Sequence, residues 1–378
     1  MSDADVIVVG GGPMGLIAAL YARRAGLRAT IVEPRNAPID KACGEGLMPA
    51  GVAALAALGV HPAGRPLRGI RYVAGHRSAV ADFCAGPGMG VRRTTLHTAL
   101  VDAAEAAGAD WVTAKVVAVS QDSGGVRLAT ATRTGAGPTL TSPYVVAADG
   151  LHSPMRHRLG LDRPRRGSAG THQRHGLRRH FALPPWSDRV EVHWGATAEL
   201  YVTPVTDDQV GVAALSRQIA PFDEMLRQFP AVAERLAGAA AGPVRGAAGL
   251  RQRSRRRTAG RILLIGDAAG YVDALTGEGI ALGAAQARCA IDAVLARTPQ
   301  AYEAAWHSVS RLPNALTHAL VSTTRFGPGR RLIVPGAATF PGVFARVVDL
   351  IGSPHPSPEP PPDAIPLAPN GIAKVTHD

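Results

Sequence analysis

The sequence predicts an α/β fold in which a parallel sheet is interrupted by an inserted antiparallel sheet. Residues 5–33 read as a buried strand, a glycine-rich turn, a helix and a second strand, which together make a βαβ unit. Residues 176–214 instead contain segments that alternate between apolar and polar side chains, as half-exposed antiparallel strands do. Residues 261–265 return to a continuous apolar run, so the parallel sheet resumes after the insertion.

Each further element is predicted from a local pattern of residues. Residues 96–107 and 279–295 are rich in alanine and read as helices, and residues 222–237 read as a third helix. We expect strands over residues 67–83, 111–120, 126–131 and 144–148. Repeated prolines exclude helix and sheet from the tail of residues 353–378, which we predict to be disordered.

This order of elements predicts two interleaved domains and a helical C-terminal region. The parallel sheet and its helices need chain from both sides of the insertion. We assign a nucleotide-binding domain to residues 1–66, 91–165 and 251–300, a substrate domain to residues 67–90 and 166–250, and helices to residues 301–352.

Composition and charge narrow the class of partner. The formal net charge is +12 and the isoelectric point is near 10.5, in part because arginine is abundant in proteins of high-GC genomes. An anionic nucleotide or a membrane surface suits this charge. Nucleic acid is not an expected partner, because no binding motif is present and the aromatic residues, at 4%, are not interleaved with basic ones.

The cysteines and the N-terminus indicate a cytoplasmic protein. Cys43, Cys84 and Cys289 lie far apart, which excludes zinc-ligand spacing and a dense disulfide framework. Residues 1–5 are acidic where a signal peptide would be basic. A run of about 18 apolar residues, which would predict a membrane-spanning helix, does not occur.

The first chemical motif is a glycine-rich turn between a strand and a helix. Its sequence, Gly10-Gly11-Gly12-Pro13-Met14-Gly15, matches G-x-G-x-x-G. Gly10 permits the tight turn, Gly12 lets the backbone approach a diphosphate, and Gly15 lets the helix pack against the strand. The amides at the helix start then face the phosphates, as in a Rossmann-like dinucleotide site.

A carboxylate follows at the distance that this kind of site requires. Glu33 ends the second strand, 18 residues beyond Gly15, where it would accept the ribose hydroxyls and repel a 2′-phosphate. We therefore expect FAD or NAD rather than NADP at this turn, and we assign Arg35 to the same site.

A second motif decides between those two dinucleotides. Residues 261–287 read RILLIGDAAGYVDALTGEGIALGAAQA and resemble the GD segment of the flavoprotein hydroxylase and geranylgeranyl reductase superfamily. Members bind FAD on a GR2-type, aromatic hydroxylase fold. The resemblance implies that Gly266 and Asp267 lie at the ribityl chain, although Asp267 also suits a helix N-cap. It also implies that the amides of Gly277, Gly279 and Ile280 approach the flavin pyrimidine edge, where a helix N-terminus stabilises the negative charge of reduced flavin.

Three further positions resemble sequences of the same superfamily. Asp149-Gly150 follows a predicted strand and resembles the DG motif, whose aspartate is associated with FAD and with the nicotinamide nucleotide. Arg93, or its neighbour Arg92, stands at a helix start, where relatives carry an arginine that contacts the FAD diphosphate. Val116 takes the position whose backbone meets the adenine in relatives.

The segment after the second strand points to a subfamily. Residues 41–47, KACGEGL, resemble the K-x-C-G-G segment of geranylgeranyl reductases, which lies along the isoalloxazine, with Glu45 replacing the middle glycine. The resemblance implies that Cys43, Gly44 and Glu45 lie beside the flavin. Cys43 is then a candidate catalytic thiol that donates a proton, or a cysteine that acts only as a small apolar side chain.

The inserted sheet is expected to form the floor of the substrate pocket. Residues 201–204, YVTP, are similar to the strand that covers the flavin in relatives, but they lack the aromatic-rich form of the reductases. Trp194 and Tyr201 are candidate substrate residues, with core packing as the alternative. A metal site at His172, His175 and His180 is not expected, because the arginines between them would repel a cation.

The resemblance therefore implies an FAD-dependent oxidoreductase that takes hydride from NADH or NADPH. In the favoured reading it is a monooxygenase that hydroxylates a phenolic or lipophilic small molecule in specialised, polyketide-type metabolism. In the alternative it is an ene-reductase of the geranylgeranyl reductase type that acts on isoprenoid or polyene double bonds. Residues 312–351 are both basic and apolar, which predicts peripheral contact with an anionic membrane that liposome flotation would test. The oligomeric state stays open.

Overall fold

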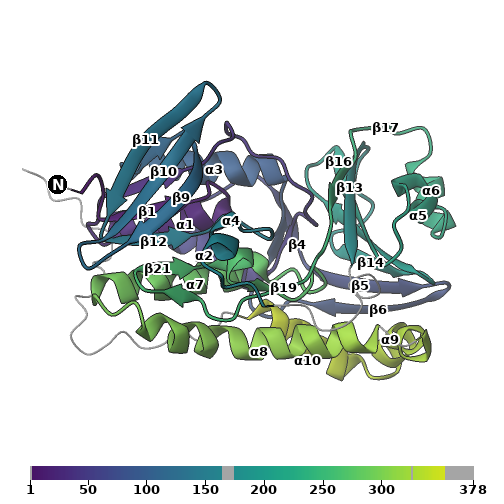
Figure 1. Cartoon of the computed structure of the whole chain (residues 1–378). Coiled ribbons are helices and arrows are strands. Elements are labelled where there is room, and N and C mark those ends of the chain that lie inside the picture. Colours follow the sequence, from purple (N-terminus) through teal and green to yellow (C-terminus); the bar gives the residue numbers. More distant parts are fainter. Residues whose placement is uncertain (1, 164–173, 325–326, 354–378) are drawn as a thin grey trace, which may run out of the picture.

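The structure, a computed structural model, describes residues 2–163, 174–324 and 327–353. The predicted disordered tail and His172 lie outside these residues. Figure 1 shows a parallel sheet at one end of the molecule and a large antiparallel sheet at the other, with the long helix α8 running beneath both. The α/β fold with an interleaved antiparallel sheet is therefore confirmed.

The six-stranded sheet has the order β20-β21-β12-β1-β2-β8, and all of its pairs are parallel except β20 with β21. Its central strands are buried along their whole length, which explains their continuous runs of apolar, mostly β-branched residues. The strands are β1 Val6–Val9, β2 Ala29–Val32, β8 Asp110–Val112, β12 Tyr144–Ala147, β20 Thr258–Ala259 and β21 Ile262–Leu264.

Helices pack on this sheet, and two of them, α1 and α7, begin at the cavity described below. Helix α1 packs against β1 and β2 and lies between α3 and α7, while α8 packs on α7. A three-stranded antiparallel sheet, β9-β10-β11, lies beside β1 (Figure 1). The bounds are α1 Pro13–Arg24, α2 Pro49–Ala57, α3 Arg93–Ala106, α4 Pro154–Arg158, α7 Gly279–Leu295, α8 Ala301–Thr323, β9 Lys115–Gln121, β10 Val126–Thr132 and β11 Gly135–Ser142.

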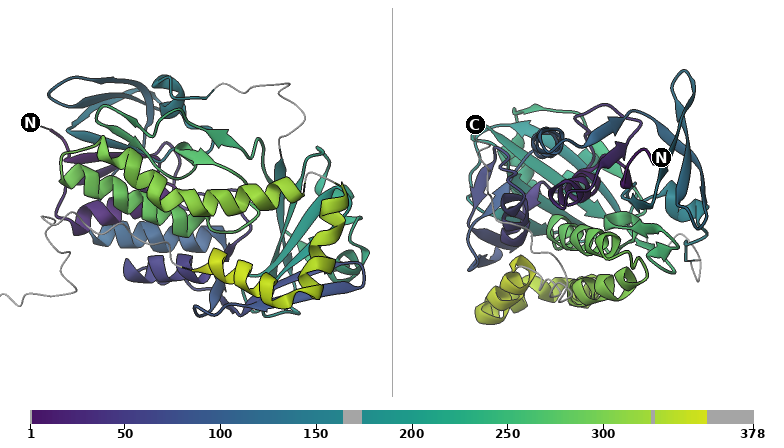
Figure 2. Two further views of the ribbon diagram at one scale, coloured as in Figure 1. Left: turned by 90° about the horizontal axis from the view of Figure 1, so that it is seen from below. Right: turned by 90° about the vertical axis from the view of Figure 1, so that its left-hand side faces the viewer.

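The inserted sheet has eight strands in the order β17-β13-β16-β15-β14-β5-β6, with β18 also paired to β13. Only β14 and β5 run parallel. Figure 2 shows α9 and α10 below this sheet, where both pack on β6. The strands are β5 Gly69–Ala74, β6 Arg77–Asp82, β13 His175–Ala182, β14 Val190–Trp194, β15 Ala198–Pro204, β16 Gln209–Ser216, β17 Ala240–Ala241 and β18 Arg245–Ala247, and the helices are α9 Gly327–Thr339 and α10 Pro341–Gly352.

Short elements join the two large sheets. The three-stranded sheet β3-β7-β4 and the two-stranded sheet β19-β22 lie between them, and a 3-10 turn at Gly266–Ala268 precedes β22. Their bounds are β3 Gly46–Leu47, β4 Arg65–Leu67, β7 Gly88–Gly90, β19 Gln252–Arg253 and β22 Gly270–Tyr271.

Two predicted elements differ from those observed. Residues 111–120 form two strands, β8 and β9, because the chain leaves the parallel sheet at residue 113 and joins the three-stranded sheet. Residues 222–237 form two short helices, α5 Phe222–Leu226 and α6 Pro230–Leu236, because Pro230 lacks the amide that a continuous helix needs.

None of the described helices alone is long and apolar enough to cross a bilayer, and α9 with α10 has that length and hydropathy only as a pair bent by 105°. Leu332, Phe340 and Val343 in this region are each more than 60% exposed.

Candidate cofactor and substrate site

One cavity of about 700 Å³ extends from the glycine-rich turn to the inserted sheet. Most of the predicted site residues line it. From the cofactor prediction these are Gly10, Gly12, Pro13, Met14, Glu33, Arg35, Cys43, Gly44, Glu45, Arg93, Val116, Asp149, Gly150, Gly266, Asp267, Gly277, Gly279 and Ile280, and from the substrate prediction Tyr201. Gly15 and Trp194 are not among the lining residues.

The three glycines of the G-x-G-x-x-G pattern have two different roles. A Cβ on Gly15 would lie 1.8 Å from the Gly10 carbonyl oxygen, and a Cβ on Gly10 would lie 2.6 Å from the Ala148 carbonyl oxygen. Gly10 also has a φ of 109°, which favours glycine. The turn itself therefore requires both residues. A Cβ on Gly12 would come no closer than 4.0 Å, to Nη2 of Arg93, so Gly12 keeps space open in the cavity.

The amide ends of two long helices face this cavity. Helices α1 and α7 both begin at lining residues, and neither has a side-chain hydrogen bond at its N-cap. Their first amides are therefore available to an anionic or carbonyl ligand. Arg93 adds a cation beside Gly12. A diphosphate at α1 and a polar ring edge at α7 fit these donors, which is the arrangement that an extended FAD requires.

Glu33 is held in place by its own surroundings. Its Oε2 accepts a hydrogen bond from the Gly11 amide at 2.9 Å, and its Oε1 accepts one from Arg35 Nε at 2.7 Å. Burial opposes ionisation of Glu33, but the bonds from Arg35 and Gly11 outweigh burial and lower its pKa. Glu33 therefore carries negative charge at neutral pH, as the predicted ribose contact requires.

The aspartate of the DG motif caps a helix. Asp149 Oδ2 accepts a hydrogen bond from the Met155 amide at 2.8 Å, and Oδ1 accepts one from the Ser153 hydroxyl. Burial raises the pKa of Asp149, although these bonds act against that rise. The side chain thus holds the start of α4, a local role that sequence analysis did not predict.

Arg156 joins the DG motif to the GD motif. This buried side chain donates hydrogen bonds to the carbonyl oxygens of Leu151 and Ala268, each at 3.0 Å. Its Nε also donates to Asp162 at 2.7 Å. The two segments on either side of the cavity are therefore fixed relative to each other by one guanidinium.

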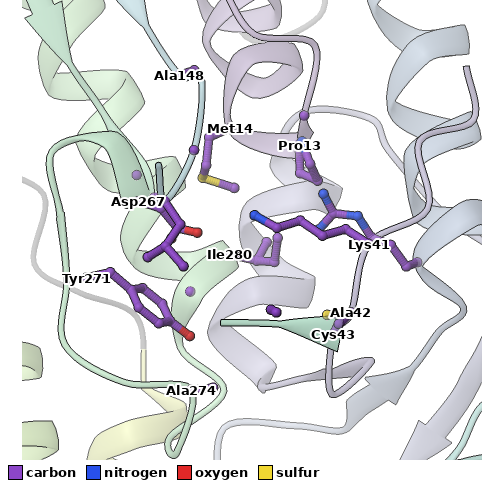
Figure 3. A pocket seen from close by; sticks show the side chains of 18 of the residues that line it. Pro13, Met14, Lys41, Ala42, Cys43, Ala148, Asp267, Tyr271, Ala274 and Ile280 are labelled. Atoms are coloured by element: carbon purple, nitrogen blue, oxygen red, sulfur yellow. The ribbon is translucent and has the colours of Figure 1, made fainter. Parts of the chain in front are cut away.

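Asp267 lies across the cavity from the segment that contains the cysteine. Figure 3 shows Asp267 and Tyr271 on one side and Lys41 and Cys43 on the other. Burial raises the pKa of Asp267, and the charge of Lys41 partly offsets this. Cys43 is a free, half-buried thiol whose Sγ accepts a hydrogen bond from the Glu45 amide at 3.4 Å.

The far end of the cavity belongs to the inserted sheet. Tyr201 and residues 213–215 line it, together with Tyr271, which sequence analysis missed although it lies within the GD segment. Burial raises the pKa of Tyr201 and of Tyr271, so both are hydroxyl donors at neutral pH. The Tyr201 hydroxyl has no hydrogen-bond partner among the described residues.

Trp194 lies away from the predicted pocket. It packs edge-on against Tyr72, with ring centroids 5.4 Å apart, in an apolar cluster that also contains Phe344. Trp194 and Val192 are buried on the same side of β14 and belong to this cluster under the sheet. Core packing accounts for Trp194.

No group of three or more His, Cys, Asp or Glu side chains that could hold a metal ion occurs in the described part of the chain. The imidazole of His180 instead forms hydrogen bonds with Glu45 and Arg178.

Glu278 makes protein stability depend on pH. This carboxyl stands at the N-cap of α7, and burial raises its pKa from 4.5 to about 7. The folded state therefore binds the proton more tightly than the unfolded state does. The free energy of unfolding is expected to fall as pH rises from about 5 to 7, by up to about 1.4 kcal/mol per pH unit from this group.

Urea unfolding of the wild type and Glu278→Gln at pH 5, 6, 7 and 8 measures this effect. The glutamine variant should lose this part of the decline between pH 5 and 7, and the difference between the two proteins should then level off. If the free energies of unfolding of the two proteins differ by the same amount at every pH from 5 to 8, Glu278 is not the titrating group.

Comparisons with known proteins agree with this geometry. The family described as "FAD binding domain" matches residues 3–298. A menaquinone reductase of Mycobacterium tuberculosis is 31% identical in an alignment of 326 residues that covers 77% of this chain and 76% of that protein. A 6-methylpretetramide 4-monooxygenase of Streptomyces rimosus is 53% identical over 60 residues, 16% of this chain and 14% of that protein.

Solved structures share the fold. The p-nitrophenol 4-monooxygenase of Pseudomonas putida superposes with a TM-score of 0.77 at 18% identity, covering 92% of this chain and 98% of that one. At this identity the likeness concerns the fold alone.

Proposed function

This chain belongs to the FAD binding domain family and is an FAD-dependent oxidoreductase, and from that premise we propose that it hydroxylates a phenolic, lipophilic small molecule. NADH or NADPH serves as the electron donor in this proposal. The overall change is balanced: the nicotinamide gives a hydride and the solvent a proton, one atom of O₂ enters the aromatic ring, and the other leaves as water.

The continuity of the cavity carries this proposal. A single space joins the glycine-rich turn to Tyr201 and residues 213–215, so nothing separates a ligand on the inserted sheet from the cofactor site. Leu177, Leu215 and Leu250 give the sheet end an apolar lining. Such a lining excludes water and suits a lipophilic body, while the tyrosine hydroxyls suit one or two oxygen atoms.

We assign the cofactor contacts as follows. The α1 amides and Arg93 hold the diphosphate, Glu33 holds the adenosine ribose, and Asp267 holds the ribitol. The α7 amides stabilise the negative charge of the reduced ring. Bound FAD supplies the redox chemistry, namely hydride acceptance and oxygen activation.

A second candidate function is the reduction of a double bond or a quinone ring. Two observations favour it: Cys43 and Tyr271 both line the cavity as protonatable groups, and the curated relative that matches three quarters of this chain is named a menaquinone reductase. In this candidate a hydride passes to one carbon and a side chain gives the proton to the other atom.

One experiment separates the two candidates. The FAD-loaded protein is reduced with NADPH without oxygen and then mixed with ¹⁸O₂-saturated buffer and a panel of phenols. Hydroxylation predicts one ¹⁸O atom in a phenol, and Cys43→Ala should leave that yield unchanged. Cys84→Ala is the matched control, because Cys84 is exposed and does not line the cavity.

The opposite result would favour reduction. Reoxidation without label in any phenol, together with anaerobic conversion of a prenylated naphthoquinone, would contradict hydroxylation. Loss of that conversion in Cys43→Ala, with FAD retained, would then identify the proton donor.

A further inference from the structure

The inserted sheet holds the segment that contains Cys43. We call residues 40–46 the flavin loop. Thr203 on β15 donates a hydrogen bond to the Gly44 carbonyl oxygen at 2.9 Å, and Arg178 on β13 forms an ion pair with Asp40. Six of the loop's seven residues, those from Lys41 to Gly46, line the cavity. Contacts from the substrate side of the molecule therefore determine where one wall of the cofactor site lies.

Glu45 is the most restrained residue of this loop. Its φ of 59° lies in the left-handed region that favours glycine, and its side chain is only 3% exposed. A carboxylate in such a place costs backbone strain and desolvation. Gly211 on the neighbouring strand β16 leaves room for it, because a Cβ there would lie 2.9 Å from Glu45 Oε2.

Each oxygen of Glu45 accepts a hydrogen bond from a different part of the fold. Oε1 accepts from the amide of Arg93, at the start of α3, at 2.8 Å. Oε2 lies 2.6 Å from Nε2 of His180 on β13. The carboxylate thus bridges the helix that carries the predicted diphosphate arginine and the inserted sheet.

Arg178 fixes which nitrogen of His180 carries the proton. Its Nη1 lies 2.9 Å from His180 Nδ1, and a guanidinium can only donate, so Nδ1 must accept. The proton of a neutral His180 then sits on Nε2 and is donated to Glu45. The hydrogen bonds are therefore donated in one direction, from Arg178 to His180 and from His180 to Glu45.

We propose that Glu45 is a positioning residue that sets the flavin loop against the isoalloxazine and couples it to the inserted sheet through His180. The inference rests on FAD occupying the cavity as proposed above. Through this bridge, the same carboxylate fixes the Cys43 wall, the start of α3 and the face on which a substrate would lie.

The test is a set of three variants with opposite expectations. Glu45→Gln keeps the shape but has one acceptor oxygen, so its amide NH₂ must face either the Arg93 amide or His180 Nε2, donor against donor. His180→Leu removes the donor from a buried carboxylate. His180→Gln retains an amide donor near Nε2. Arg179→Gln is the matched control, because Arg179 lies between Arg178 and His180 in sequence but bonds to Asp223 and the Gly242 carbonyl.

The measurements are titration of each apoprotein with FAD and the visible spectrum of the bound flavin. Glu45→Gln and His180→Leu should weaken FAD binding about tenfold and shift the flavin absorption bands, since a lost charge-assisted bond of this kind is worth that much. His180→Gln and Arg179→Gln should bind and absorb like the wild type.

Other outcomes overturn the inference. Wild-type affinity and spectrum in both Glu45→Gln and His180→Leu would show that the bridge does not position the loop. If His180→Gln and Arg179→Gln weaken FAD binding as much as the other two variants do, the cause is general damage to β13 and not loss of the bridge. Failure of the wild type itself to bind FAD would instead contradict the proposed function.

Discussion

Gly12→Ala is expected to weaken FAD binding about 100-fold while the apoprotein folds normally. The added Cβ meets no described atom closer than 4.0 Å, so the fold accepts it. It does occupy the space through which the α1 amides would reach the diphosphate. Losing two hydrogen bonds to a charged group costs about 3 kcal/mol, which corresponds to that factor in affinity. Thermal unfolding of the apoprotein and titration with FAD measure the two quantities separately.

Two further glycines are the controls for this result. Gly15→Ala should destabilise the apoprotein itself, because its Cβ would lie 1.8 Å from the Gly10 carbonyl oxygen. Gly336→Ala should lower neither the stability of the apoprotein nor its affinity for FAD, because a Cβ on this residue of helix α9 would meet nothing within 4 Å. If Gly12→Ala binds FAD like the wild type, the diphosphate does not approach this turn.

Arg156→Met is expected to lower the free energy of unfolding by at least about 2 kcal/mol, because two buried carbonyl oxygens each lose a donor at a cost of about 1–3 kcal/mol. Arg156 is 3% exposed and pairs with Asp162 while donating to the Leu151 and Ala268 carbonyl oxygens. Methionine keeps the length of the side chain but leaves these acceptors unpaired. FAD affinity should fall as well, because the DG and GD segments lose their common contact.

Arg158→Met provides the comparison within the same helix. Arg158 is exposed and donates one hydrogen bond, to the Val117 carbonyl oxygen at 3.1 Å. Its loss should cost less than about 1 kcal/mol. Urea unfolding of both variants at pH 7 measures the difference, and equal costs would mean that Arg156 is not the structural link described above.

Elements that depend on local patterns could be predicted from the sequence. The helix at residues 279–295 has the bounds that its alanine-rich pattern predicted. The glycine-rich turn also lies between β1 and α1 as predicted, because backbone sterics make glycine necessary at Gly10 and Gly15. Pro230, which divides residues 222–237 into two helices, is visible in the sequence, so this break is also a local feature.

Contacts between distant segments could not be predicted in this way. Glu45 and His180 are 135 positions apart, and no periodicity connects a loop to the strand that it meets in space. Tyr271 reaches the cavity because β22 pairs with β19, a pairing of two residues that leaves no pattern in the sequence. Trp194 and Tyr201 lie on adjacent strands, and only tertiary packing separates the cavity residue from the core residue.

The strand order of the parallel sheet has a consequence for biosynthesis. β1 pairs with β12, and β12 pairs with β21, so neighbouring strands begin at residues 6, 144 and 262. At roughly 5–20 residues per second, the ribosome completes the third strand on the order of tens of seconds after the first. Until then the glycine-rich turn has no opposite wall formed by residues 265–283. An emerging chain should therefore be unable to retain flavin, and the yellow colour would report that at least the first 283 of its 378 residues have been made.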